Sequence, residues 1–384
     1  MVNIIKIGIQ LLQAGKPTIP DRKSPKSLLH YAGRSLVFML LQASSLLYSI
    51  IIWFRLFLYQ KGIFSRFSLP CAVISVGNIT TGGTGKTPTV IEIARILQQH
   101  GKRAAILTRG YRRKTAIPNY VVDFDADVRQ VGDEPLLMLR KLSDVPVIVG
   151  SQRYISGKLA LERFQPDVLL LDDGFQHIQL RRDLDLVLID ATNPFGGEYL
   201  LPAGFLREPL DHLRRAQAFV ITRSNEVHDI TPIVRRLQQI APDAQIFTGI
   251  HTLDVIRPIA SDSPVDSASL RRKRLLAVSG LGNPQSFREL LSGHGLNVVN
   301  YLDFADHHWY TEEDIVRIRQ IIIREQIDAI MTTEKDEIKL LAYFQESGAC
   351  YIAAIRLDIQ PEKKFEHFLL NTIRKKHNGL SVLR

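Results

Sequence analysis

Short apolar runs alternate with segments of helical periodicity along most of the chain. Runs rich in β-branched residues predict strands at 72–76, 103–108, 146–150, 168–171, 185–190, 219–222, 244–257, 275–279, 298–304, 328–332 and 351–359. Apolar residues at helical spacing predict helices at 89–99, 131–142, 284–291, 311–325 and 361–376. Strands that alternate with helices in this way are typical of the α/β class.

The longest apolar run, residues 36–54, contains no charged side chain. A helix needs roughly 20 such residues to cross a bilayer, so this length permits a crossing. Basic residues lie on both sides of the run, with Arg34 before it and Arg55 and Lys61 after it, so no charge asymmetry places one end outside. We predict a membrane-associated helix within 31–66 that lies in or dips into the inner leaflet; a transmembrane anchor and a buried core helix are the alternatives.

A glycine-rich segment follows the strand at 72–76 and precedes the helix at 89–99. It contains Thr80, Thr81, Gly82, Gly83, Thr84, Gly85, Lys86 and Thr87. Strand, glycine loop and helix in this order form the context of a phosphate-binding loop, or P-loop, although Thr80 stands where the usual pattern has glycine. Backbone amides and the helix N-terminus can bind phosphates, Lys86 can reach the β- and γ-phosphates, and the Thr87 hydroxyl can bind Mg²⁺. The segment predicts a nucleoside triphosphate site, with a purely structural turn as the alternative.

Two adjacent carboxylates, Asp172 and Asp173, end another apolar strand. In P-loop NTPases an acid at a strand end holds Mg²⁺ together with the P-loop hydroxyl, so both are candidate metal ligands, with a plain turn as the alternative. The strand at 219–222 is followed by Arg223-Ser224-Asn225, where a GTPase would show Asn-Lys-x-Asp. Guanine specificity is therefore not expected, and ATP with Mg²⁺ is the predicted cofactor pair.

Further loops at strand ends are candidates for the second substrate. The loop that begins with Arg109 and Tyr111 is basic and aromatic, which suits an anionic substrate, although a solvated turn has a similar composition. The long loop at 191–209 is punctuated by Gly and Pro, which is typical of a segment that binds something or moves. Asp133 and Glu134 open a predicted helix, where acids cap the helix dipole and where a general base is equally well placed.

The chain of 384 residues has a formal net charge of +10, which favours an anionic partner. Its basic residues flank the apolar run instead of interleaving with aromatic residues along one face, so we expect no nucleic-acid partner. Two cysteines make neither a disulfide framework nor a metal cluster, which fits a reducing compartment. A membrane ATPase of the partitioning type is the main rival, but its P-loop has a lysine where this chain has Thr81. The oligomeric state is left open.

An ordered set of motifs gives the chain a specific resemblance. The motifs are Val76-Gly-Asn-Ile-Thr-Thr-Gly-Gly-Thr-Gly-Lys-Thr-Pro88, Thr108-Arg-Gly-Tyr111, Gly132-Asp-Glu-Pro135, Asp172-Asp-Gly-Phe-Gln-His177, Leu201-Pro-Ala-Gly204, Leu206-Arg-Glu-Pro209, Asp306-His-His308 and Thr332-Thr-Glu-Lys-Asp336. From about Leu36 to the C-terminus the chain resembles the tetraacyldisaccharide 4'-kinases, the lipid A 4'-kinase family. It departs from that family at Gly197-Glu198-Tyr199, where Asn-Gly-Arg is common, and at Arg112, where glycine is common.

The resemblance implies a kinase on the cytoplasmic face of the inner membrane, monotopic or peripheral, in contact with anionic lipids. It implies transfer of the γ-phosphate of ATP to the 4'-hydroxyl of a lipid A disaccharide 1-phosphate precursor. By position, Asp133 matches the family's proposed base, and His307 matches the histidine that pairs with it. Lys86 would hold phosphates with Thr87. Candidate substrate contacts are Arg109, Tyr111, Arg153, Gln176, His177 and Arg207.

These features define the expected domain order. We predict a basic N-terminal extension (1–30), the membrane-associated helix (31–66), a P-loop NTPase-like three-layer α/β domain (67–250), a smaller α/β domain with hinge strands (251–360) and a C-terminal basic helix (361–384). The strand at 351–359 is expected to pair with the strand that ends near Arg257, which gives the family's two-stranded linker. Because Asp133 and His307 fall in different domains, closure is expected before transfer.

Overall fold

The computed structural model describes residues 25–110, 119–346 and 348–381. Its strands are β1 (Ala72–Asn78), β2 (Ala104–Thr108), β3 (Asn119–Val121), β4 (Val147–Gly150), β5 (Val168–Asp172), β6 (Leu184–Asp190), β7 (Ala218–Thr222), β8 (Gln245–Pro258), β9 (Leu275–Ser279), β10 (Val298–Asp303), β11 (Ala329–Thr333) and β12 (Cys350–Gln360). Its α-helices are α2 (Pro25–Gln60), α3 (Lys86–Gln99), α4 (Val128–Val131), α5 (Asp133–Lys141), α6 (Arg153–Phe164), α7 (Thr231–Ile240), α8 (Ser267–Leu270), α9 (Pro284–Gly293), α10 (Glu312–Arg324), α11 (Glu334–Phe344) and α12 (Glu362–Ser381). The α/β class is confirmed; the sequence pattern did not predict β3, α4, α6, α7, α8 and α11.

One sheet runs through the described part of the chain, in the strand order β10-β9-β11-β12-β8-β7-β6-β1-β5-β2-β4-β3. Its neighbours are parallel except for β3 with β4 and β8 with β12. β1 is buried along its whole length and lies between β5 and β6, at the point where the winding of the sheet reverses. Such a switch point opens a crevice at the carboxyl ends of parallel strands. The P-loop follows β1 and emerges at this crevice.

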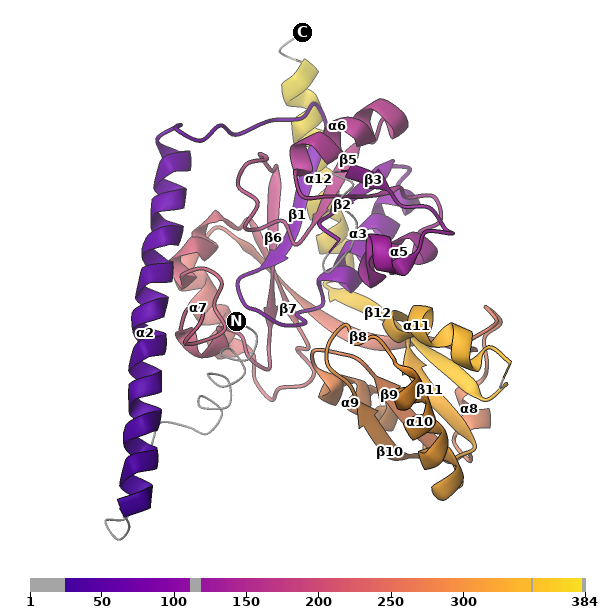
Figure 1. Ribbon diagram of the computed structural model, residues 1–384. Helices are drawn as coiled ribbons and strands as arrows, with labels where there is room; N and C mark the ends of the chain where they lie inside the picture. The colour runs from indigo at the N-terminus through magenta and orange to yellow at the C-terminus, as the bar shows by residue number, and fades with distance from the viewer. Residues whose placement is uncertain (1–24, 111–118, 347, 382–384) are drawn as a thin grey trace.

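The two longest strands, β8 and β12, connect the two halves of the molecule. They pair antiparallel, from Tyr351 opposite Pro258 to Gln360 opposite Thr248, as the sequence predicts for a two-stranded linker. The amino-terminal end of β8 also pairs with β7, and β12 also pairs with β11. The smaller half therefore has its own helices but continues the same hydrogen-bonded sheet (Figure 1).

Separate apolar cores lie in the two halves. One core of the larger half packs α3 and α5 against the sheet, and α12 returns from the end of β12 to join it through Phe365, Leu369 and Ile373. The cores of the smaller half lie on both faces of its strands and include Ile315 and Ile318 of α10 and Phe287 of α9. The C-terminal helix is thus part of the larger half in space, although the smaller half precedes it in sequence.

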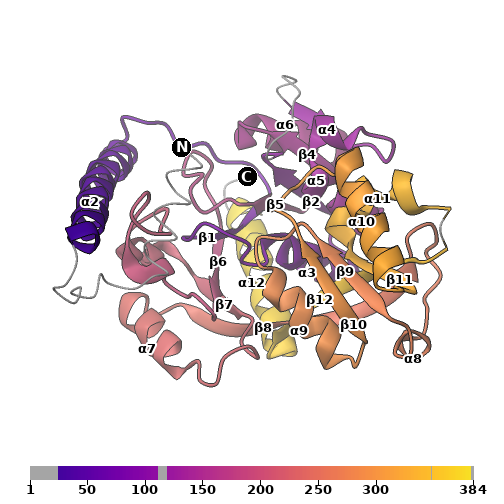
Figure 2. The ribbon, with the colours of Figure 1, turned by 60° about the horizontal axis from the view of Figure 1, so that its bottom comes forward.

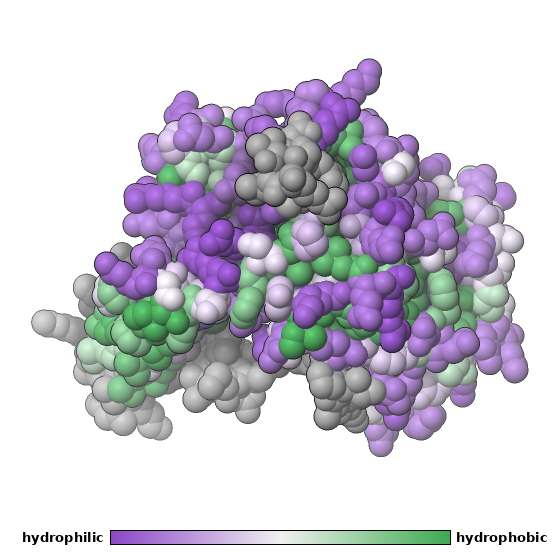
Figure 3. Space-filling model, turned by 90° about the horizontal axis from the view of Figure 1, so that it is seen from above, coloured by the Kyte–Doolittle hydropathy of each residue, from purple (hydrophilic) through white to green (hydrophobic). Residues whose placement is uncertain are grey.

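Helix α2 stands at the side of the molecule and runs along its flank (Figures 1 and 2). Residues Val37–Gln60 are long and apolar enough to cross a membrane, with a mean hydropathy of 1.9, and only 11% of the apolar window is buried. Its exposed residues include Leu40, Leu47 and Ile51, and hydrophobic side chains gather over α2 in the space-filling view (Figure 3). By length and composition alone this is weak evidence for membrane association. A fully buried core helix is excluded by this exposure.

Candidate active site

The P-loop lines a cavity of about 950 Å³ between the two halves, and all of Thr80 to Thr87 contribute to its wall. Gly85 has a left-handed φ of 87°, which glycine adopts without strain, and α3 begins at the next residue. The Thr84 hydroxyl accepts a hydrogen bond from Asn78 Nδ2 at 2.9 Å, and the Thr222 hydroxyl donates to the Thr84 carbonyl at 3.1 Å. The loop is therefore held by strands β1 and β7, and the positive end of α3 points at a space large enough for a triphosphate.

Asp172 ends β5 and lines the cavity, and one of its two carboxylate oxygens has no hydrogen-bond partner. Its Oδ2 accepts a hydrogen bond from the Thr108 hydroxyl at 2.8 Å, whereas its buried Oδ1 has no hydrogen-bond partner. Burial, with the negative charges of Glu134 and Asp173, raises the pKa of Asp172 to about 7. A buried carboxylate without a compensating cation favours the binding of one.

Asp173, in contrast, is already paired with cations. Arg207 Nη1 and Nη2 donate to its two carboxylate oxygens at 2.7 and 3.1 Å, and Lys86 Nζ lies 3.8 Å from Oδ1. Burial alone would raise the pKa of Asp173, but the charges of Lys86 and Arg207 lower it to about 2. Asp173 therefore positions two basic side chains beside the P-loop.

The side chains of Thr87 and Asp172 fit Mg²⁺. Both line the cavity, both offer oxygen atoms, and the free Oδ1 of Asp172 supplies the anionic ligand that a hard cation prefers. Mg²⁺ in such sites takes one or two protein oxygens and completes its shell with phosphate and water. Within the described residues no group of three or more His, Cys, Asp and Glu side chains is suited to a metal ion, so an all-protein metal cage is not found there.

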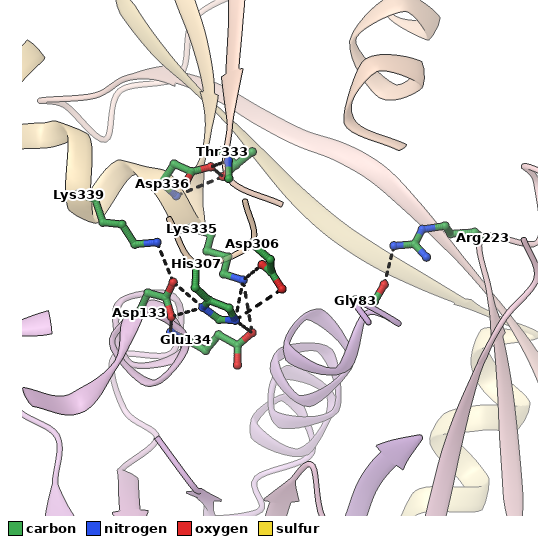
Figure 4. A network of polar contacts seen from close by, with 11 residues as sticks. Gly83, Asp133, Glu134, Arg223, Asp306, His307, Thr333, Lys335, Asp336 and Lys339 are labelled. Atoms are coloured by element: carbon green, nitrogen blue, oxygen red, sulfur yellow. Dashed lines mark hydrogen bonds and ion pairs between the residues drawn. The ribbon is translucent and has the colours of Figure 1, made fainter. Parts of the chain in front are cut away.

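An Asp–His pair joins the two halves beside this cavity (Figure 4). His307 lies in the loop after β10, with a left-handed φ of 59°, and Asp133 begins α5. His307 Nδ1 lies 2.9 Å from both carboxylate oxygens of Asp133, and Lys335 Nζ donates to His307 Nε2 at 3.2 Å. With Nδ1 facing both carboxylate oxygens, this ring nitrogen is placed to donate a hydrogen bond to Asp133. Of the two, His307 lines the cavity and Asp133 lies behind it.

Helix α11 supplies two lysines that the sequence analysis did not select. Lys335 contacts Asp306 at 2.8 Å and Glu134 at 3.8 Å, and Lys339 contacts Asp133 Oδ2 at 2.9 Å. Burial alone would raise the pKa of Asp133, but the His307 hydrogen bond and the charges of Lys339 and Lys335 hold it well below its usual range. The signal in the sequence is their spacing of four, which places both lysines on one helix face.

The candidate substrate contacts divide into two groups. Arg109 and Arg207 line the cavity. Arg153, Gln176 and His177 are not among the described residues that line it. Arg153 is buried behind β5 and donates to the Gly150 and Asp172 carbonyls, whereas Gln176 Nε2 donates to the Asn78 carbonyl. Tyr111 lies outside the described residues.

His177 is partly buried and lies close to several arginines. Burial, with the charges of Arg153 and Arg182, lowers the pKa of His177 to about 4. Its Nε2 atom has no hydrogen-bond partner.

Two more residues that line the cavity, Arg223 and His251, were not predicted as site residues from the sequence. Arg223 Nη2 donates to the Gly83 carbonyl at 2.7 Å, and its guanidinium also pairs with Asp190. His251 of β8 packs against Gly85 so closely that a Cβ at that glycine would lie 3.0 Å from His251 Nε2. Burial, with the charge of Arg223, lowers the pKa of His251 to about 4. Neither residue belongs to a recognisable sequence motif. Arg223 and His251 reach the cavity because β7 and β8 lie beside the P-loop in the folded protein.

Most of the chain is similar in sequence to one family of known proteins. A sequence model of the family described as tetraacyldisaccharide-1-P 4'-kinase matches residues 37–374. The chain belongs to this family. It is 38% identical over 356 residues to the tetraacyldisaccharide 4'-kinase of Syntrophus aciditrophicus, covering 89% of this chain and 94% of that protein. It is 36% identical over 349 residues to the tetraacyldisaccharide 4'-kinase of Halothermothrix orenii, covering 86% of this chain and 87% of that protein.

A solved structure of the family agrees with the fold. The crystal structure of LpxK from Aquifex aeolicus in complex with ATP superposes with a TM-score of 0.68 at 33% identity, and covers 86% of this chain and 97% of that chain. The resemblance stated from the motifs is therefore confirmed, and so is the expected two-part α/β fold. The matched segment begins at residue 37, within α2, and ends within α12.

Proposed function

We propose that this protein transfers the γ-phosphate of ATP to the 4'-hydroxyl of a tetraacyldisaccharide 1-phosphate, a step of lipid A biosynthesis. Membership of the kinase family over residues 37–374 supports the reaction and the acceptor. The observation that carries the proposal is that Lys86 and His307, from opposite halves, line one cavity. A phosphate donor site and an Asp–His pair thus face each other across a space that a sugar hydroxyl can enter.

On the donor side, the P-loop amides and Lys86 bind the triphosphate of ATP. Thr87 and Asp172 would hold Mg²⁺, which neutralises charge on the phosphates when bound. Asp173 keeps Arg207 beside the P-loop, where its guanidinium can contact the transferred group or the acceptor. Phosphoryl transfer depends mainly on such positioning and charge neutralisation, because the protein does little covalent chemistry.

On the acceptor side, the Asp133–His307 pair takes the proton of the 4'-hydroxyl as the new bond forms, with His307 at the cavity wall and Asp133 behind it. A sugar hydroxyl is a weak nucleophile, so a positioned base accelerates the attack. The pair exists only when the two halves are close together, because Asp133 belongs to α5 and His307 to the loop after β10. Closure therefore completes the site and limits hydrolysis of ATP by water.

We infer that α2 lies at the cytoplasmic face of the inner membrane, with flanking basic residues toward anionic lipids. Support comes from its contacts with the loop at 199–207: the Ser45 hydroxyl donates to the Leu200 carbonyl at 2.8 Å, and the Tyr48 hydroxyl donates to the Arg207 carbonyl at 3.0 Å. These side chains lie near the middle of the apolar segment. A helix whose middle is hydrogen-bonded to the catalytic half favours a position in the interface over a perpendicular crossing.

The direct test is transfer of radiolabel from γ-labelled ATP to a detergent-dispersed lipid A disaccharide 1-phosphate. We expect labelled lipid, dependent on Mg²⁺. ATP hydrolysis without labelled lipid would overturn the proposal and favour a switch ATPase of the membrane surface.

A further inference from the structure

Lys339 makes a buried contact with the proposed base from the opposite half of the molecule. Its Nζ atom lies 2.9 Å from Asp133 Oδ2, and the two side chains are 2% and 6% exposed. The ammonium comes from α11 of the smaller half, and the carboxylate comes from α5 of the larger half. His307 binds the same carboxylate, so two groups of the smaller half hold one carboxylate of the larger half (Figure 4).

The charges around Asp133 separate the roles of the two lysines. Lys335 faces two other carboxylates, those of Asp306 at 2.8 Å and Glu134 at 3.8 Å. Among the described residues, Lys339 forms an ion pair with Asp133. The groups that act on the Asp133 carboxylate are His307 from the loop after β10, Lys335 and Lys339 from α11, and the backbone N–H of Glu134, which donates to Oδ1 at 3.1 Å. Of these, Lys339 is the direct counter-charge.

Packing fixes the position of the Lys339 ammonium. It lies 5.7 Å from the centre of the Trp309 ring, and Arg129 of α4 approaches the same ring at 5.6 Å. A cation over an indole face is attracted to the ring. Lys339 is thus held by an aromatic ring as well as by the carboxylate, and Trp309 brings the two halves together at the same place.

We propose that Lys339 is a positioning residue that orients Asp133 and keeps it ionised in the closed site. The physical reason is the burial of Asp133: a carboxylate removed from water takes up a proton unless a cation compensates it. His307 orients Asp133 through a hydrogen bond from its ring, whereas Lys339 places an ammonium group beside Oδ2 of the same carboxylate. The proposal rests on the kinase activity and on the Asp133–His307 pair as its base.

The test compares Lys339→Met, which keeps the length of the side chain and removes its charge, with Lys339→Arg, which keeps the charge. For Lys339→Met we expect kcat to fall about 10- to 100-fold, with the KM for ATP changed less than twofold, because Lys339 does not line the cavity. The acidic limb of the pH profile of kcat/KM should move to higher pH. Lys339→Arg should restore the position of that limb, and Lys363→Met, an exposed change on α12, should behave as the wild type.

Thermal unfolding gives a readout that needs no activity. Lys339→Met leaves Asp133 without its counter-charge, so its Tm should fall, and adding Asp133→Asn should recover part of that loss. Unchanged kcat and an unchanged acidic limb in Lys339→Met would overturn the role of Lys339, as would strictly additive losses of Tm. Absence of lipid labelling by the wild-type enzyme would overturn the kinase proposal instead, so the two failures are distinguishable.

Discussion

His307 Nδ1 lies within 2.9 Å of both carboxylate oxygens of Asp133, although 174 residues separate the two in sequence. Their contact is formed between a loop of the smaller half and the first turn of α5. A carboxylate and an imidazole in this arrangement act as one unit in proton transfer. This relationship gives the first prediction.

Asp133→Ala and His307→Ala should each lower kcat for lipid phosphorylation by about 10²- to 10⁴-fold, the range for a lost general base. The double variant should be little worse than the poorer single variant, because each change already disables the pair. Steady-state rates of label transfer at saturating ATP measure this. Losses that multiply in the double variant would show that the two residues act independently.

Arg207→Gln should raise the KM for ATP and lower transfer by about 10²-fold, in line with the loss of one charged stabilising group. The reason is that Asp173, released from its two hydrogen bonds, would draw Lys86 away from the phosphates. Arg207→Lys should recover little, because an ammonium cannot make the paired contact. Adding Asp173→Asn to Arg207→Gln should lower the KM for ATP again. A KM that stays as high as in Arg207→Gln would contradict this explanation. Arg163→Gln, an exposed change on α6, serves as the control.

Asp172→Asn should raise the Mg²⁺ concentration needed for half-maximal transfer by at least about 10-fold, because the free Oδ1 is the anionic ligand offered to the cation. Chelation by EDTA should abolish transfer by the wild-type enzyme. A Mg²⁺ titration of the initial rate measures both effects. Asp211→Asn carries the same change at an exposed site and should leave the titration unchanged. An identical Mg²⁺ curve for Asp172→Asn would remove Asp172 from the metal site.

The burial of His251 should make the protein sensitive to acid. Its pKa is about 4 in the folded state, below the usual value of 6.5, so the unfolded chain takes up a proton first as pH falls. Stability from this group is complete above about pH 6.5 and is lost between pH 6.5 and 4, at about 1.4 kcal/mol per pH unit.

Urea unfolding across that pH range should show a shallower acid loss in His251→Gln than in the wild type. His228→Gln, a change at an exposed histidine, provides the matched control. Equal slopes for His251→Gln and the wild type would mean that His251 is not buried in its neutral form in solution.

The exposed apolar face of α2 should determine binding to membranes. Leu47→Glu combined with Ile51→Glu should reduce co-sedimentation with anionic vesicles by more than 10-fold, because both side chains are over half exposed on the apolar helix. Transfer to detergent-dispersed acceptor should be affected far less. Ile323→Glu, on the exposed surface of α10, removes a still more exposed apolar side chain away from α2 and should leave sedimentation unchanged. Vesicle binding that survives the α2 changes would assign the membrane contact to another surface.

The sequence alone determined the elements and chemistry that depend on neighbouring residues. The β-branched runs give buried strands such as β1 and β5, because their side chains are apolar on both faces. The P-loop and the acids Asp172 and Asp173 can be recognised in the sequence. Their glycine, lysine and carboxylate residues occur at fixed distances along the chain from the end of a strand. The family followed from the order of these motifs, and the linker pairing followed from two long apolar strands.

Tertiary structure decided which groups meet. The sequence could not separate Asp172 from Asp173, because their difference lies in Arg207, which reaches Asp173 from a distant loop. It also could not find Lys339, His251 or Arg223, whose contacts come from strand order and closure of the two halves. Patterns along a chain report burial and local geometry, whereas counter-charges come from segments far apart in sequence. For that reason the donor site was predicted in detail, and the surroundings of Asp133 became visible only in the folded molecule.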